Sequence, residues 1–248
     1  MRRSVVIPAH NEEATIAMVV RAVRSDSDDI IVVASCCTDR TAAEATAAGA
    51  RVTTVETLGK HYAIRRGLQA AAGDLVAFVD GDLVEPQGGL AGLLFEALSP
   101  GVSLAKGFYN RTEQSQARLT EICARPLLSL LRPSLAGIHD PLSGEYAVRR
   151  DLVRRWAFAP GFAVDLGFLL AAEREGEIRE VNLGVKQHRH RSVLALGQAA
   201  VQVAATLLGT TTNSDCVVLP QPIPTTLDCV GIDIRSLPPL DPDFMGVQ

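Results

Sequence analysis

The chain has 248 residues, of which 47% are hydrophobic and 21% charged, with a formal net charge of −4. This composition is typical of a globular protein with one large domain, and the negative charge argues against nucleic-acid binding through a general basic field. The five cysteines show neither zinc spacing nor an even disulfide framework, which favours a reducing cytoplasm. No apolar run has the composition of a membrane span. We therefore expect a cytoplasmic protein without nucleic-acid or membrane partners.

In chain order, short β-rich apolar runs alternate with segments of helical period. The first helix shows this period clearly, because Ile16, Val19, Val20 and Val23 recur at i, i+3, i+4 and i+7. The expected strands are 5–7, 30–33, 51–54, 74–79, 103–108 and 178–185. The expected helices are 16–23, 41–48, 61–72, a helix after Pro86, 114–131, 164–175 and 193–208. This alternation predicts an α/β fold with a mostly parallel sheet flanked by helices.

The composition changes near residue 209. Residues 1–209 are expected to form the compact domain, and residues 210–248 a C-terminal tail that holds six of the 13 prolines. Such a density of proline predicts an extended arm or a partly disordered segment. Two apolar pieces of the tail, 217–219 and 230–232, could pack on the body of the protein or on a second subunit.

Two carboxylates, Asp80 and Asp82, follow the apolar run that ends at Val79. Carboxylate oxygens suit hard cations such as Mg2+ and Mn2+, which often accompany the phosphates of a nucleotide. The carboxyl end of a strand is also where an open α/β sheet binds ligands. A solvated turn is the alternative, since Asp-Gly is ordinary turn sequence.

Polar residues follow two other strands and precede a helix. The segment Pro8 to Glu13 places two acids at the start of the first helix, where they could contact a nucleotide or simply cap the helix. Small polar residues from Ser35 onward would let a nucleotide approach the backbone. Lys60 could lie over a phosphate, although a lone loop lysine is usually only solvated.

These motifs, with later ones, resemble the GT-A-fold (Rossmann-like) glycosyltransferases, and within them the retaining glucosyl-3-phosphoglycerate synthases. The resemblance covers about residues 4–209. The matching segments are Pro-Ala-x-Asn-Glu-Glu at 8–13, Gly-Lys at 59–60, Asp-x-Asp at 80–82, the helix from Arg118 to Leu128, Pro141 to Tyr146, and Val181 to Val185 leading into His188 and Arg189. The resemblance implies a nucleotide-sugar-binding half, about residues 1–110, and an acceptor-binding half, 111–209.

The same resemblance assigns roles to single residues. Asp82 and His188 would hold a divalent metal, Mn2+ or Mg2+, although the basic run around His188 is more often a surface cluster. Donor contacts would come from Pro8, Ala9, Asn11, Glu12, Ser35, Lys60, Asp80 and Gly81. Catalytic contacts would come from Asp82, Leu142, Ser143, Glu145, Asp165 and Arg189. Acceptor contacts would come from Arg118, Thr120 and His190. Glu145 could equally be an internal partner of Tyr146 or of an arginine.

The resemblance implies a metal-dependent, retaining transfer of a hexose from a nucleoside-diphosphate sugar to a small polar acceptor. The acceptor typical of the family is 3-phosphoglycerate. The resemblance also implies that the enzyme is a homodimer. Four residues depart from the family pattern. In the acceptor site, His190 stands in place of an asparagine and Ala117 in place of a glycine. Near the nucleobase, Ala34 stands in place of an aspartate, and at the sugar-binding acid, Asp165 stands in place of a glutamate. An enzyme with another donor, such as a GDP-sugar, and a hydroxyl or thiol acceptor is therefore an alternative. A non-catalytic nucleotide-sugar-binding protein is another. The Gly-rich loop of sugar-1-phosphate nucleotidyltransferases is absent.

Overall fold

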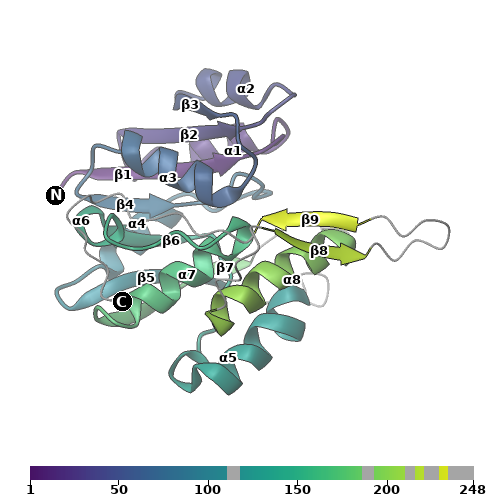
Figure 1. Ribbon diagram of the computed structural model, residues 1–248. Coiled ribbons are helices and arrows are strands. Elements are labelled where there is room, and N and C mark those ends of the chain that lie inside the picture. The colour runs from purple at the N-terminus through teal and green to yellow at the C-terminus, as the bar shows by residue number, and fades with distance from the viewer. Residues whose placement is uncertain (111–117, 186–192, 210–215, 221–228, 234–248) are drawn as a thin grey trace.

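The computed structural model describes residues 1–110, 118–185, 193–209, 216–220 and 229–233 (Figure 1). Residues 1–110 and most of 118–185 build one α/β layer structure around a central sheet.

A seven-stranded sheet runs in the order β3-β2-β1-β4-β6-β5-β7 (Figure 1). Its strands are β1 (Arg3–Ala9), β2 (Asp29–Ser35), β3 (Arg51–Val55), β4 (Leu75–Phe78), β5 (Val102–Asn110), β6 (Tyr146–Arg149) and β7 (Glu177–Val185). Neighbouring strands are parallel except where β6 pairs with β4 and β5 in the antiparallel sense. The predicted mostly parallel sheet is thereby confirmed.

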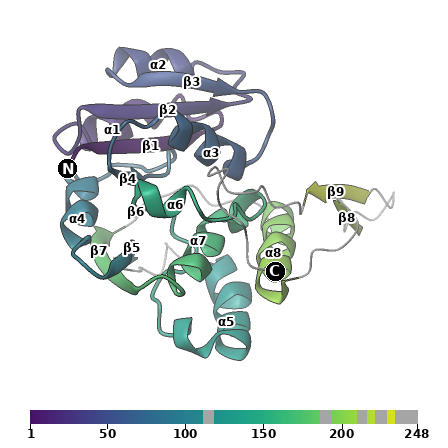
Figure 2. The ribbon, with the colours of Figure 1, turned by 60° about the vertical axis from the view of Figure 1, so that its left-hand side comes forward.

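Helices cover both faces of the sheet. The helices are α1 (Ile16–Ala22), α2 (Thr41–Ala47), α3 (Lys60–Ala70), α4 (Leu90–Ala97), α5 (Arg125–Leu131), α6 (Arg150–Val153), α7 (Val164–Ala172) and α8 (Val193–Leu208), with short turns η1 (Thr120–Ala124), η2 (Pro133–Leu135) and η3 (Gly161–Ala163). Apolar side chains of α1, α2 and α4 share one core cluster, and those of α3 and α7 share the other. The sheet therefore lies between two helical layers (Figure 2).

Alternation of side chains along β1 explains the two cores. Val5 and Ile7 pack with α1 and α4, whereas Val6 between them packs with α3. All three are fully buried, because a central parallel strand carries a helix on each face. This double burial accounts for the continuous apolar runs that the sequence shows at β1 and β2.

A second helical group, α5 and α8, lies beyond the sheet next to α7 (Figures 1 and 2). The predicted helix 114–131 begins outside the described residues and contains η1, a π-helical turn, before α5. Pro126 has no amide hydrogen to donate to the carbonyl four residues earlier, which is the physical reason for an irregular turn at this place. The helical prediction is otherwise confirmed over the described part.

The sequence-based expectation missed the strand β6 and the hairpin in the tail. The four-residue strand β6 was not predicted, although it lies between β4 and β5 in the sheet. In the tail, the two apolar pieces form an antiparallel hairpin of β8 (Cys216–Pro220) and β9 (Cys229–Asp233). β9 contacts α8, so part of the predicted arm lies against the body.

Candidate active site

Three loops meet at the carboxyl edge of the sheet, because β1, β2 and β4 are parallel neighbours. The Asn11 side-chain carbonyl accepts a hydrogen bond from the Thr38 amide at 2.8 Å, and the Glu13 carboxylate accepts one from the Arg40 amide at 3.1 Å. These bonds join the loop after β1 to the loop after β2. The sequence-predicted donor residues of the two loops are thus brought to one edge.

The loop after β4 packs against the loop after β1. The Thr15 hydroxyl donates to the Gly81 carbonyl at 2.8 Å, and a Cβ at position 81 would lie 3.1 Å from the Pro8 carbonyl oxygen. A side chain at this position would therefore push Pro8 and Ala9 away. The small size of Gly81 sets the close approach of these two predicted donor loops.

One carboxylate oxygen of Asp82, Oδ1, is buried and accepts no hydrogen bond from the described residues. Such an oxygen is costly unless a donor or a cation reaches it. A divalent cation would satisfy it, and carboxylate oxygen is a preferred ligand of Mg2+ and Mn2+. The environment of Asp82 therefore fits the predicted metal.

Lys60 bridges two acids from distant parts of the chain. Its Nζ lies 2.7 Å from Asp80 Oδ1 and 2.6 Å from Asp165 Oδ2. Burial alone would lower the pKa of Lys60, but the charges of Asp165 and Asp80 outweigh it and raise the pKa above the ordinary lysine value. The lysine therefore remains an ammonium ion, and the solvated-loop interpretation of Lys60 is wrong.

Asp165 lies in the first turn of α7 and is only 2% exposed. One oxygen binds Lys60, and the other, Oδ1, is buried without a hydrogen-bond partner among the described residues. Burial, and then the charge of Asp165, raises the pKa of the neighbouring Tyr146 phenol, so the phenol stays protonated. The Tyr146 phenol and the Lys60 ammonium are therefore two polar groups beside this carboxylate.

The segment Pro141 to Tyr146 enters the same region and leads into β6. The Ser143 hydroxyl donates to Glu145 Oε2 at 2.7 Å, and both residues are buried. A Cβ on Gly144 would overlap the carboxylate of Asp80. Half-buried Leu142 packs on the core that includes α7. The predicted sugar-side residues Leu142, Ser143 and Glu145 therefore lie close to Asp80.

Two predicted acceptor residues, Arg118 and Thr120, lie at the start of the helical segment formed by η1 and α5. Thr120 is 2% exposed, and its hydroxyl lies 3.4 Å from Asp140 Oδ1. Asp140 directly precedes the segment Pro141 to Tyr146 in the sequence. Arg125 Nη2 donates to the His139 carbonyl at 2.9 Å and adds a second link. Arg118 is exposed. Thr120 thus contacts the residue just before the sugar-side segment, and Arg118 faces solvent.

Three predicted site residues, His188, Arg189 and His190, lie outside the described residues, as does Ala117. Within the described ranges, no group of three or more histidine, cysteine or acidic side chains is arranged to hold a metal. The metal ligand set therefore stays a prediction that combines Asp82 with His188.

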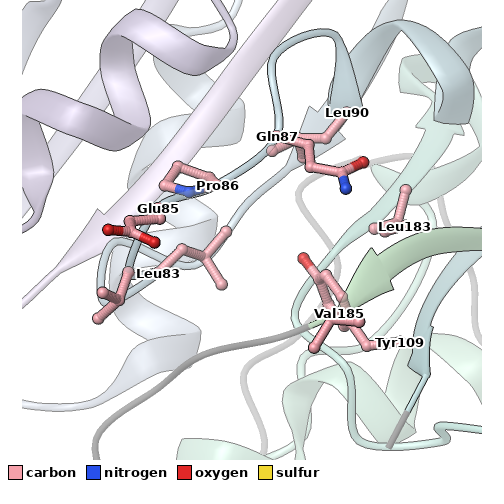
Figure 3. Close-up of a pocket in the computed structure, with 9 residues that line it drawn as sticks. Leu83, Glu85, Pro86, Gln87, Leu90, Tyr109, Leu183 and Val185 are labelled. Atoms are coloured by element: carbon pink, nitrogen blue, oxygen red, sulfur yellow. The ribbon is translucent and has the colours of Figure 1, made fainter.

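A small cavity lies just beyond Asp82, between the loop 83–87 and the ends of β5 and β7 (Figure 3). Its volume, about 10 Å³, corresponds to roughly one water molecule. Leu83, Leu183 and Val185 line it with other mostly apolar side chains. The cavity is too small for a sugar or a nucleotide, so we place the donor at the polar carboxyl edge instead.

Two residues near this edge were missed from sequence, Lys106 and Asp140. Lys106 is fully buried within β5, and its Nζ donates to the Ser143 carbonyl at 2.6 Å. The available signal was a lysine in the middle of an apolar strand, where charged side chains are rarely buried. Asp140 carried no such signal, because an acid before proline is ordinary turn sequence.

Replacing Gly144 with alanine is expected to lower kcat/KM for the donor at least tenfold. The added methyl group would overlap Asp80 and force it away from Lys60. Initial rates over a donor concentration series would measure the effect. Gly137→Ala is the matched control, because a Cβ at this position meets nothing within 4 Å. Equal kinetics of Gly144→Ala and the wild type would contradict the packing argument.

A mostly parallel sheet with carboxylates and a buried lysine at its carboxyl edge is typical of nucleotide-binding α/β domains. Residues 4–154 match the model of glycosyl transferase family 2, and the chain belongs to this family. The chain is therefore a glycosyltransferase. No helix among the described residues has both the length and the apolar character needed to cross a membrane.

Three comparisons with known proteins give a more specific match than the family model. The chain is 42% identical over 233 residues to a glucosyl-3-phosphoglycerate synthase of Mycobacterium tuberculosis, covering 83% of this chain and 72% of the relative. It is 40% identical to the synthase of Mycolicibacterium smegmatis, covering 86% and 78%. A crystal structure of the M. tuberculosis synthase with Mn2+, UDP-glucose and phosphoglyceric acid matches with a TM-score of 0.88 and 37% identity, covering 96% of this chain and 90% of that one. The predicted family and GT-A fold are confirmed.

Proposed function

We propose that the chain is a metal-dependent, retaining hexosyltransferase that moves glucose from UDP-glucose to 3-phosphoglycerate. The observation that carries this proposal is the match to the M. tuberculosis synthase structure, which holds Mn2+, UDP-glucose and phosphoglyceric acid. Another structure of that synthase contains Mg2+ and UDP. The predicted divalent metal and nucleotide-sugar donor agree with these structures.

The donor would lie along the edge formed by the loops after β1, β2 and β4. The predicted nucleoside contacts are Pro8, Ala9, Asn11, Glu12 and Ser35, whose loops are joined by hydrogen bonds. Lys60, Asp80 and Gly81 continue this edge toward Asp165. Residues 1–110 would therefore act as the nucleotide-sugar half and 111–209 as the acceptor half.

Asp82 and His188 would hold the divalent metal. The buried Oδ1 of Asp82 supports this role, because it accepts no hydrogen bond from the described residues. When bound, the metal would offset the negative charge that develops on the departing diphosphate. Arg189, a permanent cation, would add to the same stabilisation.

Transfer would retain the anomeric configuration. The acceptor hydroxyl attacks the anomeric carbon from the face of the leaving group, the bond from that carbon to the β-phosphate oxygen breaks, and the departing diphosphate takes the hydroxyl proton. The chain then needs no nucleophile of its own. Its contribution is to hold the sugar, with Asp165 and Glu145 accepting hydrogen bonds from sugar hydroxyls beside Leu142 and Ser143.

The acceptor site is formed in this proposal by Arg118, Thr120 and His190. One observation favours the alternative of a different acceptor, because the Thr120 hydroxyl already faces the carboxylate of Asp140. A carboxylate beside this hydroxyl disfavours an acceptor phosphate there. A second candidate is therefore a glycosyltransferase of specialised metabolism, with another nucleotide sugar and a hydroxyl or thiol acceptor.

We also propose that the enzyme acts as a homodimer in the cytoplasm. The contact would involve the C-terminal helices. Beside α8, the packed elements η1 and α5 expose two apolar residues, Ile122 and Leu130. The free thiols of Cys36, Cys37 and Cys123 are compatible with a reducing compartment.

Turnover assays with Mn2+ test the proposed substrates. UDP-glucose with 3-phosphoglycerate is expected to give product, with an α-linked sugar by NMR, and GDP-glucose is expected to give at least tenfold less. Preference for GDP-glucose, or for an acceptor without phosphate, would support the specialised enzyme instead. Binding of UDP-glucose with no turnover on any acceptor of a panel would favour the non-catalytic alternative.

A further inference from the structure

Lys106 lies in the middle of β5 with none of its surface exposed. Taking an ammonium group out of water is costly unless hydrogen bonds and opposite charges replace the lost solvation. The neighbouring residues of the strand, Ala105 and Gly107, are buried as well. The stability of this arrangement therefore depends on what Nζ contacts.

Among the described residues, the ammonium group of Lys106 contacts one segment, Ser143 to Tyr146. Nζ donates to the Ser143 carbonyl at 2.6 Å and lies 5.0 Å from the centre of the Tyr146 ring, within the range of a cation–π interaction. The next amide on β5, of Gly107, donates to the Glu145 carbonyl at 2.8 Å. Two adjacent residues of β5 thus bind two carbonyls of the segment that enters β6.

Charges on several elements face the ammonium group. Burial lowers the pKa of Lys106, whereas the carboxylates of Asp165, Asp140 and Glu145 offset part of that effect and the ammonium of Lys60 adds to it. Lys60 binds Asp80 and Asp165 directly. Lys106 and Lys60 are therefore two basic side chains that face the acids Asp165, Asp140 and Glu145.

The segment that Lys106 contacts, Ser143 to Tyr146, positions side chains on the donor-sugar side of the site. The Ser143 hydroxyl binds Glu145, and Gly144 lies directly against the Asp80 carboxylate. A shift of the Ser143 carbonyl would therefore change the positions of both acids. Lys106 itself has no exposed surface with which to touch a substrate.

We propose that Lys106 is a positioning residue for sugar transfer, which holds the backbone of Ser143 to Tyr146 so that Glu145 and Asp80 face the donor sugar. This inference rests on the proposed function, but its structural part can be tested without turnover. Loss of the ammonium would leave the nucleoside edge formed by the β1 and β2 loops unchanged.

Lys106→Met removes the ammonium group and keeps much of the side-chain volume. With UDP-glucose, 3-phosphoglycerate and Mn2+, we expect kcat to fall at least tenfold while the affinity for UDP with Mn2+, measured by calorimetry, stays within about threefold. Hydrogen exchange of the amides in residues 143–146 is expected to accelerate, with exchange in β1 and β2 unchanged.

Ser103→Ala is the matched control on the same strand. The Ser103 hydroxyl is buried and donates to the Ala172 and Glu177 carbonyls, far in sequence from the sugar-side segment. The control is expected to lose stability without a change in kcat or in exchange of residues 143–146. An unchanged kcat in Lys106→Met, or an equal loss of kcat in both variants, would overturn the proposal.

The experiment also distinguishes two other outcomes, a variant that does not fold and a wild-type enzyme that does not use the proposed substrates. If Lys106→Met does not fold, Lys106→Leu, which also lacks a hydrogen-bond donor, is measured against the same thresholds. If the wild type does not turn over UDP-glucose and 3-phosphoglycerate, the proposed substrates are wrong, and hydrogen exchange alone decides the role of Lys106. Unchanged exchange in residues 143–146 would then overturn it.

Discussion

Replacing Asp82 with asparagine is expected to lower kcat at least a hundredfold while the protein stays folded. A hundredfold loss corresponds to about 2.7 kcal/mol of transition-state stabilisation, within what a metal contributes to charge stabilisation. The substitution keeps the size of the side chain and removes its charge. Because Oδ1 accepts no hydrogen bond from the described residues, the native fold loses little.

The role of Asp82 in metal binding can also be tested without measuring turnover. Mn2+ with UDP is expected to raise the melting temperature of the wild type, since a ligand of the native state stabilises it, and to leave Asp82→Asn nearly unchanged. The control is Asp28→Asn, an exposed acid at the opposite end of β2 from the donor edge. A full Mn2+-dependent shift in Asp82→Asn would remove Asp82 from the metal site.

The donor edge could be predicted from sequence because its determinants are local. Each predicted loop directly follows an apolar strand, and parallel strands place their carboxyl ends together. This rule was enough to bring Asn11, Ser35 and Asp80 to one edge. The edge therefore follows from strand order and direction alone.

Other features depend on pairing over long sequence distances. Lys60 and Asp165 are separated by 105 residues, and no spacing in the sequence indicates that they form an ion pair. β6 has only four residues, too few for a periodic signal, and its antiparallel pairing separates β4 from β5. The burial of Lys106 follows from this insertion, because Lys106 is opposite Tyr146 in the β5–β6 register.

Replacing Lys60 with methionine is expected to destabilise the protein by about 3 kcal/mol, because loss of one partner leaves a buried charge without compensation. Burial raises the pKa of Asp165 even beside Lys60, and loss of the lysine would leave this carboxyl group without its ion-pair partner while only 3% of its side chain is exposed. Urea denaturation at pH 7 measures the free energy of unfolding. Arg40→Met is the control. Arg40 forms an ion pair with Glu44, and 76% of the Arg40 side chain is exposed. The loss of this surface pair is expected to lower the free energy of unfolding by less than about 1 kcal/mol.

A double-mutant cycle separates the ion pair from simple loss of packing. In Lys60→Met with Asp165→Asn, the uncompensated charge at position 165 is gone, so the double variant is expected to be more stable than Lys60→Met alone. Additive losses of the two single variants would show that the 2.6 Å contact contributes nothing beyond packing. Activity should nevertheless stay low in the double variant, because neither the ammonium beside Asp80 nor the carboxylate of Asp165 remains to orient the donor.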